Sequence, residues 1–196
     1  IDRDLSYNDV VRWMYDSLYE QNIECDVVHS AGLDPKQYDL IVVPALYSAS
    51  ESLIGKLRKF VKEGGVLVSS FRSFVADRNL TVYHDTQPHG LSEVFGMSYN
   101  QFTEPGTACV KGVPVKYYAE LLKPEGAQVL AHYEHPYWGK YAALTKNAYG
   151  RGEAYYVGGF TEKERLKQVL SMAAERAGVV PEQTKEGMPF IVRSGK

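Results

Sequence analysis

The sequence predicts an α/β domain with a mostly parallel sheet, flanked by helices and extended by an antiparallel hairpin. First, the apolar runs at residues 40–43 (LIVV) and 66–68 (VLV) enclose an amphipathic segment. Such a strand–helix–strand unit implies a crossover that leaves the two strands parallel. Second, residues 142–146 and 153–157 are strand-like and are separated by the turn-rich segment NAYGRG. This arrangement is typical of a hairpin.

Before this unit, a helix is expected over residues 7–21, where one face of a 3.6-residue repeat is apolar: Val10, Val11, Met14 and Leu18. Ser6 and Asp9 form a capping-box pattern at its start, and Asn22 is the expected C-cap. Residues 24–29, with their two valines, then predict a short strand.

The helix between the two parallel strands has clear boundaries. Residues 48–51 (SASE) match a capping box. The pair Gly64-Gly65 supplies a left-handed C-cap. Between them runs a helical apolar stripe: Leu53, Ile54, Leu57, Phe60 and Val61.

The second half of the chain is less regular until its last helix. A short helix is expected at residues 90–95, loops or edge strands at 96–126, and a strand at 127–133. Residues 161–164 (TEKE) match a capping box and open a helix that stops at Gly178. Its apolar face comprises Leu166, Val169, Leu170, Ala173, Ala174 and Ala177.

We therefore expect one domain over residues 1–180, followed by a polar tail over 181–196. Within this tail, residues 189–192 (PFIV) are strand-like.

Composition excludes several classes of protein. The 196 residues are 44% hydrophobic, and 24 acidic and 22 basic side chains give a net charge of −2. This excludes a disordered polyelectrolyte and argues against a nucleic-acid-binding protein. No apolar run reaches the ~20 residues of a membrane helix, and the polar start shows no secretory signal. Cys25 and Cys109 are expected to be unlinked thiols, in keeping with a cytoplasmic location.

In open α/β sheets, ligands bind at the carboxyl ends of the strands, here residues 45–48 and 69–73. The segment GGVLVSSFRS resembles the elbow of class I glutamine amidotransferases, where a strand runs into a nucleophilic cysteine flanked by glycines. This chain has Ser69, Ser70 and Phe71 there, with neither the cysteine nor the glycines. Ser70 is therefore a weak candidate nucleophile, and a scaffold without this chemistry is favoured.

Other catalytic or ligand-binding patterns are weak. A metal site at His132, Glu134 and His135 is not favoured. On a strand, residues 132 and 134 share one face and residue 135 points to the other, so the three side chains cannot converge on one ion. His84 and His89 are expected to be solvated. No P-loop, dinucleotide fingerprint or nucleophile motif is present, and no acid stands in a setting that marks it as catalytic. We predict no cofactor and no metal.

Aromatic side chains cluster around Pro136: Tyr133, Tyr137, Trp138 and Tyr141. Such a cluster can form a platform for a sugar ring. A packed loop or a subunit contact is favoured, because Tyr and Trp are enriched in interfaces.

Several segments, in order, resemble the trimerisation domain of glycoside hydrolase family 42 β-galactosidases. They are YDLIVVPALYSASESLIGKLRKFVKEGGVLVSSFRS, GLSEVFGMS, GAQVLAHY and GKYAALTKNAYGRGEAYYVGG. The resemblance runs from Ser6 to Gly178. It implies a flavodoxin-like fold, similar to amidotransferases. Members often have Gly where this chain has Phe74, so we expect the loop at Arg72 to differ.

The resemblance also implies how this region relates to a larger enzyme. In the family both catalytic glutamates belong to an N-terminal (β/α)8 barrel, so no catalytic residue carries over to this sequence. The tail GMPFIVRSGK resembles the start of the family's small C-terminal β-domain. Members also have a β-strand before the first helix, which is not found ahead of Ser6. A sheet without that strand has two exposed ladder edges.

The leading hypothesis is a non-catalytic assembly domain of a β-galactosidase that hydrolyses terminal β-galactosides. Its partners would be two further copies of itself and the barrel, with no nucleic acid or membrane. One alternative is a divergent amidotransferase-like hydrolase using Ser70 or Cys109, and another is a carbohydrate-binding module using Tyr137 and Trp138. The predicted interface residues are Phe71, Arg72, Phe74, Tyr137 and Trp138.

Overall fold

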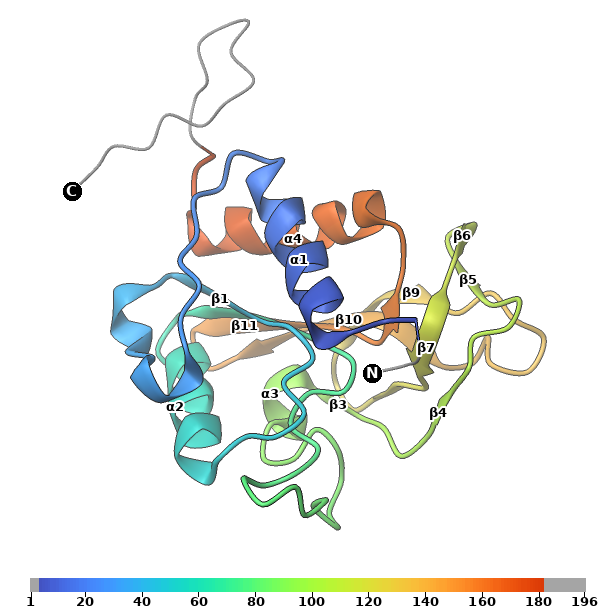
Figure 1. Ribbon diagram of the computed structural model, residues 1–196, viewed down its shortest axis with the longest axis horizontal. Coiled ribbons are helices and arrows are strands. Elements are labelled where there is room, and N and C mark those ends of the chain that lie inside the picture. Colours follow the sequence, from blue (N-terminus) through green and yellow to red (C-terminus); the bar gives the residue numbers. More distant parts are fainter. Residues whose placement is uncertain (1–3, 182–196) are drawn as a thin grey trace, which may run out of the picture.

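A five-stranded sheet forms the centre of the molecule (Figure 1). The structure is a computed structural model and describes residues 4–181. The strand order is β1-β2-β11-β10-β9. These strands are β1 (Leu40–Val43), β2 (Val66–Ser70), β9 (Gln128–His132), β10 (Ala142–Tyr149) and β11 (Gly152–Val157).

The sheet is mixed. β1, β2 and β11 are parallel, whereas β10 is antiparallel to both β11 and β9. The α/β class and the hairpin are therefore confirmed, and the sheet is mixed: two of its four strand pairs are parallel and two are antiparallel. β11 is both an arm of the hairpin and the parallel neighbour of β2, so the hairpin lies inside the sheet rather than beside it.

Helices cover both faces of the sheet (Figure 1). On one face, α1 and α4 pack with the strand residues Val66, Val68 and Tyr155. On the other face, α2 and α3 pack with Leu67 and Tyr156. The helices are α1 (Tyr7–Tyr19), α2 (Glu51–Lys62), α3 (Ser92–Phe95) and α4 (Lys163–Ala177). Among the described helices, none is both long and apolar enough to cross a membrane.

Helix α2 confirms the predicted core stripe, because its buried residues are the five expected ones. Its N-cap differs from the prediction. Ser50 rather than Ser48 precedes the helix, and its hydroxyl accepts a hydrogen bond from the Leu53 amide. The predicted capping box therefore lies at the start of the helix, but the residue that caps is Ser50 and not Ser48.

The other helix ends agree with the sequence in part. The Ser6–Asp9 capping box of α1 is present with both of its hydrogen bonds. Helix α1 ends at Tyr19 with Glu20 as C-cap, so Asn22 lies beyond the cap. The capping box predicted for α4 is wrong, because its N-cap is Glu162 and no side chain caps it. Gly178 is the left-handed C-cap, as predicted.

Between α3 and β9 the chain forms short strands at the edge of the domain, in line with the expectation for residues 96–126. A second sheet has the order β12-β7-β4, and β3-β8 and β5-β6 are pairs. These strands are β3 (Met97–Ser98), β4 (Phe102–Thr103), β5 (Cys109–Val110), β6 (Val113–Pro114), β7 (Lys116–Glu120), β8 (Lys123–Pro124) and β12 (Gly159–Phe160).

The strand predicted at residues 24–29 is wrong. This segment is extended but belongs to no sheet, and it leads into two 3-10 turns, Ser30–Gly32 and Pro35–Gln37. Val27 is 76% exposed and Val28 is 42% exposed. Valines favour a strand only where a neighbouring strand supplies hydrogen bonds and cover, and this segment has no such neighbour.

The glycines of the β10–β11 hairpin permit a close approach to α2. Gly150 has a φ of +62°, and a Cβ atom on Gly152 would lie 2.2 Å from the carbonyl oxygens of Val61 and Gly65. The predicted hairpin turn therefore accounts for the two glycines of Gly150-Arg151-Gly152.

Candidate functional site

The carboxyl ends of β1 and β2 meet at one edge of the sheet, where the sequence predicted a site. Ser70 is fully buried there, and its Oγ accepts a hydrogen bond from the Ala45 amide at 2.9 Å. The Ser69 hydroxyl donates to the Val43 carbonyl at 3.1 Å. Both serines thus join the ends of two strands, a structural use of the hydroxyl group.

After β2 the chain turns sharply. Arg72 and Phe74 have φ values of +57° and +61°, in the left-handed region that costs a non-glycine residue energy. The backbone at Phe74 therefore has the left-handed conformation that glycine favours, despite its side chain. Phe71 and Phe74 are both completely buried, and this burial offsets the strain. In this conformation neither ring can touch another subunit.

Glu120, at the end of β7, holds this turn in place and is itself completely buried. Its carboxylate accepts hydrogen bonds from the Arg72 amide at 2.7 Å and the Tyr156 hydroxyl at 2.8 Å. Burial raises the pKa of Glu120 to about 7, although these two donors favour the charged form. Nothing in the sequence around this acid indicates catalysis, and the one signal of its burial is its position inside the apolar stretch YYAELL.

An aromatic–arginine patch, defined here as Tyr47, Arg72, Phe102 and Tyr118, lies beside the turn. The Arg72 guanidinium lies 5.6 Å from the Tyr47 ring centroid and 5.2 Å from that of Tyr118. Phe102 is 65% exposed and stacks on Tyr118 at 5.2 Å. Sequence reasoning found Arg72 but missed Phe102, because its two-residue strand has no recognisable periodicity.

The aromatic loop, defined here as residues 135–138, presents a second surface. Tyr137 is 80% exposed. Trp138 is half-buried, and its ring stacks on His135 at 3.9 Å. Tyr133 turns away from this loop into the core, where its hydroxyl donates to the Glu120 carbonyl. The predicted aromatic cluster is therefore divided between core and surface.

The other candidate groups make local contacts. Among residues 4–181, no group of three or more His, Cys, Asp or Glu side chains is placed to hold a metal ion. Cys25 and Cys109 form no disulfide, and the Cys109 thiol donates to the Thr107 carbonyl at 3.7 Å.

His89 is not simply solvated. It stacks on Tyr83 and bonds to Asp85 and Glu51. Burial lowers the pKa of His89, but these two carboxylates outweigh burial and raise it.

These observations define a class of protein, an α/β domain built for contacts. The serine hydroxyls at the carboxyl ends of its strands bond to its own backbone. Its exposed aromatic side chains offer surfaces for contact with other molecules. The family described as "Beta-galactosidase trimerisation domain" matches residues 1–180. The chain belongs to this family, and the resemblance inferred from the sequence is confirmed.

Curated relatives are longer than this chain. β-Galactosidase LacA of Lactobacillus acidophilus is 31% identical over 192 residues, covering 91% of this chain and 28% of its own length. β-Galactosidase BgaB of Geobacillus sp. is 29% identical over 184 residues, which cover 90% of this chain and 27% of BgaB. The chain thus spans under a third of the relatives it matches.

Solved structures agree with the fold. The β-galactosidase from Bacillus circulans sp. alkalophilus has a TM-score of 0.84 and 26% identity, with 91% of this chain and 28% of that chain covered. The β-galactosidase Gan42B also has a TM-score of 0.84, with 29% identity and 91% and 27% covered.

Proposed function

We propose that this domain holds three copies of a β-galactosidase together, in a protein that hydrolyses terminal β-galactosides through a separate (β/α)8 barrel. The observation that carries this proposal is the family match over residues 1–180. The names of the relatives point to the same activity for the whole protein.

The domain limits follow the same reasoning. We assign residues 1–180 to a flavodoxin-like, amidotransferase-like domain and 181–196 to the start of a C-terminal β-domain. That tail lies outside the described residues apart from residue 181. A cytoplasmic location fits two cysteines that form no disulfide.

The 196-residue chain by itself is expected not to hydrolyse a nitrophenyl β-galactoside. A glycosidase needs an acid and a second carboxylate on either side of the scissile bond, and the prominent carboxylate here, Glu120, is buried among its own hydrogen-bond donors. Release of nitrophenol should not exceed the buffer rate, with full-length LacA of L. acidophilus as positive control. Turnover near the control rate that Glu120→Gln abolishes would overturn the assignment.

Threefold closure uses heterologous contacts, so two different surfaces must meet. We propose that the aromatic–arginine patch of one copy meets the aromatic loop of the next. Both surfaces carry exposed aromatic rings, Phe102 and Tyr137, and aromatic and Arg side chains are enriched in interfaces. Of the five interface residues predicted from the sequence, Arg72, Tyr137 and Trp138 remain in this proposal. Phe71 and Phe74 support Arg72 from the core.

Light scattering over a concentration series should show monomer giving way to trimer at the highest concentrations, because the barrel is expected to supply part of the interface. Phe102→Ala and Tyr137→Ala should each shift this transition upward. Tyr19→Ala, at the far end of α1 and 41% exposed, is the matched control and should not shift it. A stable dimer, or a trimer insensitive to both changes, would argue against the proposed contact.

A further inference from the structure

The connection between β2 and α3 contains a histidine, His89, with a carboxylate at each of its ring nitrogens. Nδ1 lies 2.7 Å from Asp85 Oδ2, and Nε2 lies 2.7 Å from Glu51 Oε1. The Tyr83 ring stacks nearly parallel on the imidazole, with 3.5 Å between the two ring centroids. The histidine clamp is defined here as Glu51, Tyr83, Asp85 and His89. The His89 side chain is 17% exposed, so its neighbours rather than water determine its charge.

The geometry of the histidine clamp suits a protonated ring. An ionised carboxylate only accepts hydrogen bonds, and an imidazole donates from both nitrogens only when it is protonated. A neutral ring would direct a lone pair at one of the two carboxylates from 2.7 Å. A cation over the face of an aromatic ring such as Tyr83 is also stabilised. The two in-plane contacts and the stacking contact therefore all favour the charged form of His89.

The charged groups around His89 come from more than one element. Helix α2 contributes Glu51, and the connection itself contributes Asp85. Asp77, earlier in the connection, acts on the stacked tyrosine. The Arg58 guanidinium of α2 donates to the backbone carbonyl that follows His89. Burial lowers the pKa of His89, but the carboxylates of Glu51 and Asp85 outweigh burial and raise it.

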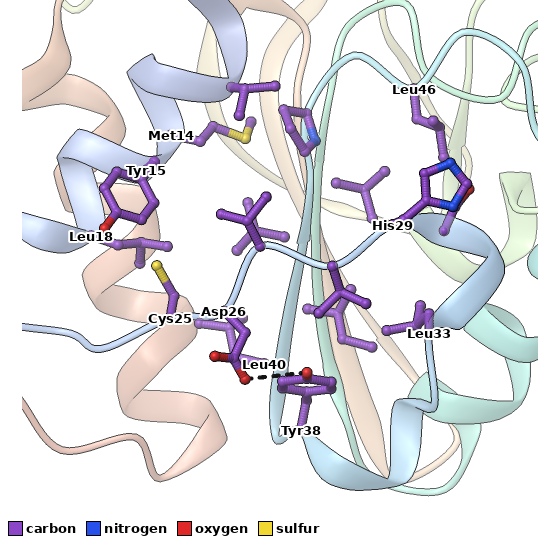
Figure 2. A pocket seen from close by; sticks show the side chains of 18 of the residues that line it. Met14, Tyr15, Leu18, Cys25, Asp26, His29, Leu33, Tyr38, Leu40 and Leu46 are labelled. Atoms are coloured by element: carbon purple, nitrogen blue, oxygen red, sulfur yellow. Dashed lines mark hydrogen bonds between the residues drawn. The ribbon is translucent and has the colours of Figure 1, made fainter. Parts of the chain in front are cut away.

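The other histidines make different contacts, and all five lie within residues 4–181. His29 lines the groove between α1, the extended segment 24–29 and β1 (Figure 2). Its Nδ1 accepts a hydrogen bond from the Ala31 amide, and His135 accepts in the same way from the Tyr137 amide. An accepting nitrogen carries no proton, so these contacts do not require a charged ring. Of the five histidines in this part of the chain, His89 alone is paired with carboxylates.

The histidine clamp joins a hairpin to the start of α2. Residues 75–83 fold back on themselves, and the Tyr83 amide bonds to the Val75 carbonyl. The turn of this hairpin presents Leu80, which is 67% exposed. The chain then returns toward α3 through residues 83–89, called here the return arm. Glu51 is the first residue of α2, so its contact with His89 fastens the return arm to the helix.

We propose that the histidine clamp is a proton-dependent fastening, in which protonated His89 holds the return arm against α2 and loss of its proton releases the arm. Asp85 contacts Nδ1 through both of its oxygens, whereas Glu51 contacts Nε2 through one and its side chain is 70% exposed. The neutral ring therefore keeps its proton at Nδ1, and the contact with α2 is the one that is lost. Because the folded state raises the pKa of His89, the clamp is complete in mildly acidic solution and is lost as pH rises through the raised value.

The test follows exchange of individual amides with water by NMR, in the 196-residue chain at about pH 6 and about pH 9. Each rate is divided by the rate of an unstructured peptide at the same pH, which gives a protection factor. Protection of the Tyr83 and His89 amides, which bond to the Val75 and Phe74 carbonyls, should fall on the order of tenfold at the higher pH. The Leu57 amide, inside α2, should change less. Nitrogen shifts of the His89 ring report its protonation in the same samples, and both changes should share one midpoint.

Three variants assign the effect. His89→Ala removes the titrating ring, so protection of the Tyr83 amide should be low at both pH values. Glu51→Gln changes an exposed side chain and should lower the pH at which His89 titrates, together with the pH at which the arm is released. His84→Gln removes an exposed histidine of the same connection and should behave as the wild type. Glu120 titrates in all of these proteins, so its contribution cancels in the comparison.

Three outcomes would overturn the proposal. Equal protection of the Tyr83 and His89 amides at both pH values would show that the arm is held without the proton. Loss of Tyr83 protection that persists in His89→Ala would assign the effect to another titrating group. An unchanged midpoint in Glu51→Gln would show that α2 takes no part, and this result does not depend on how His89→Ala folds. None of these measurements bears on whether the domain trimerises, so this proposal and the proposed function fail independently.

Discussion

Replacing Leu57 by Ala is expected to lower the free energy of unfolding by about 2–5 kcal/mol. Leu57 lies in the middle of α2 and has no exposed surface. It packs in the cluster between α2 and the sheet, together with Leu67 of β2. Truncation removes buried methyl groups and leaves a cavity that a sheet-backed helix cannot close. Urea unfolding, followed by far-UV circular dichroism, measures the change.

Lys59→Ala is the matched control on the same helix. The Lys59 side chain is 66% exposed, and its ammonium group lies 3.7 Å from the Glu63 carboxylate. Such an exposed pair contributes ~0.3–0.5 kcal/mol. If Lys59→Ala were the more destabilising of the two changes, α2 would face the sheet with a different side from the one described.

Periodicity predicted well those elements that bury one face against the sheet. The apolar stripe of α2 has the repeat of a helix, and the continuous apolar runs of β1 and β2 are typical of strands. The order strand, helix, strand then predicts the parallel pairing of β1 with β2. Helix ends were less predictable. Ser48 and Ser50 both resemble an N-cap, and the one that caps is the one whose hydroxyl reaches the Leu53 amide in the folded chain.

The predicted strand at residues 24–29 failed for a different physical reason. Its valines have the right composition, but strand formation depends on a partner that the sequence of the segment does not contain. The groove beside β1 separates it from the sheet. Similarly, the hairpin was recognised while its place inside the sheet was not, because the β11–β2 pairing joins residues far apart in the chain.

The candidate site likewise has features that could be predicted from the sequence and features that could not. Exposed aromatics such as Tyr137 could be selected from sequence, because they lie in a loop rich in rings. The burial of Phe71 and the exposure of Phe102 could not, because both depend on long-range contacts with Tyr118 of β7 and on the pairing of β4 with β7. Glu120 was missed because an acid in an apolar stretch is buried only when donors such as the Arg72 amide and Tyr156 converge on it.

Replacing Glu120 by Ala is expected to destabilise the domain by about 2–5 kcal/mol in mildly acidic solution, and by less above about pH 7, where the wild type itself is less stable. The change leaves the Arg72 amide and the Tyr156 hydroxyl without their acceptor, and each unpaired buried donor costs roughly 1–3 kcal/mol. It also leaves a cavity beneath the strained turn at Arg72. Glu120→Gln keeps the volume and one carbonyl oxygen, and its amide group can donate to the Tyr156 oxygen. It should therefore remain close to the wild type in mildly acidic solution.

The difference in stability between Glu120→Gln and the wild type should depend on pH. Burial raises the pKa of Glu120 from 4.5 to about 7 on folding, so between these values the folded state binds more protons than the unfolded state. Stability then falls as pH rises through this window and levels off above about 7. The loss is roughly 3 kcal/mol, at 1.36 kcal/mol per unit of pKa. Glutamine does not titrate, so Glu120→Gln should gain on the wild type between about pH 5 and pH 8 in parallel urea melts. Because the other titrating groups, His89 included, are common to both proteins, their effects cancel in the comparison. A wild type that gained stability relative to Glu120→Gln over this range would mean that the fold lowers the pKa of Glu120, with its hydrogen-bond donors outweighing burial.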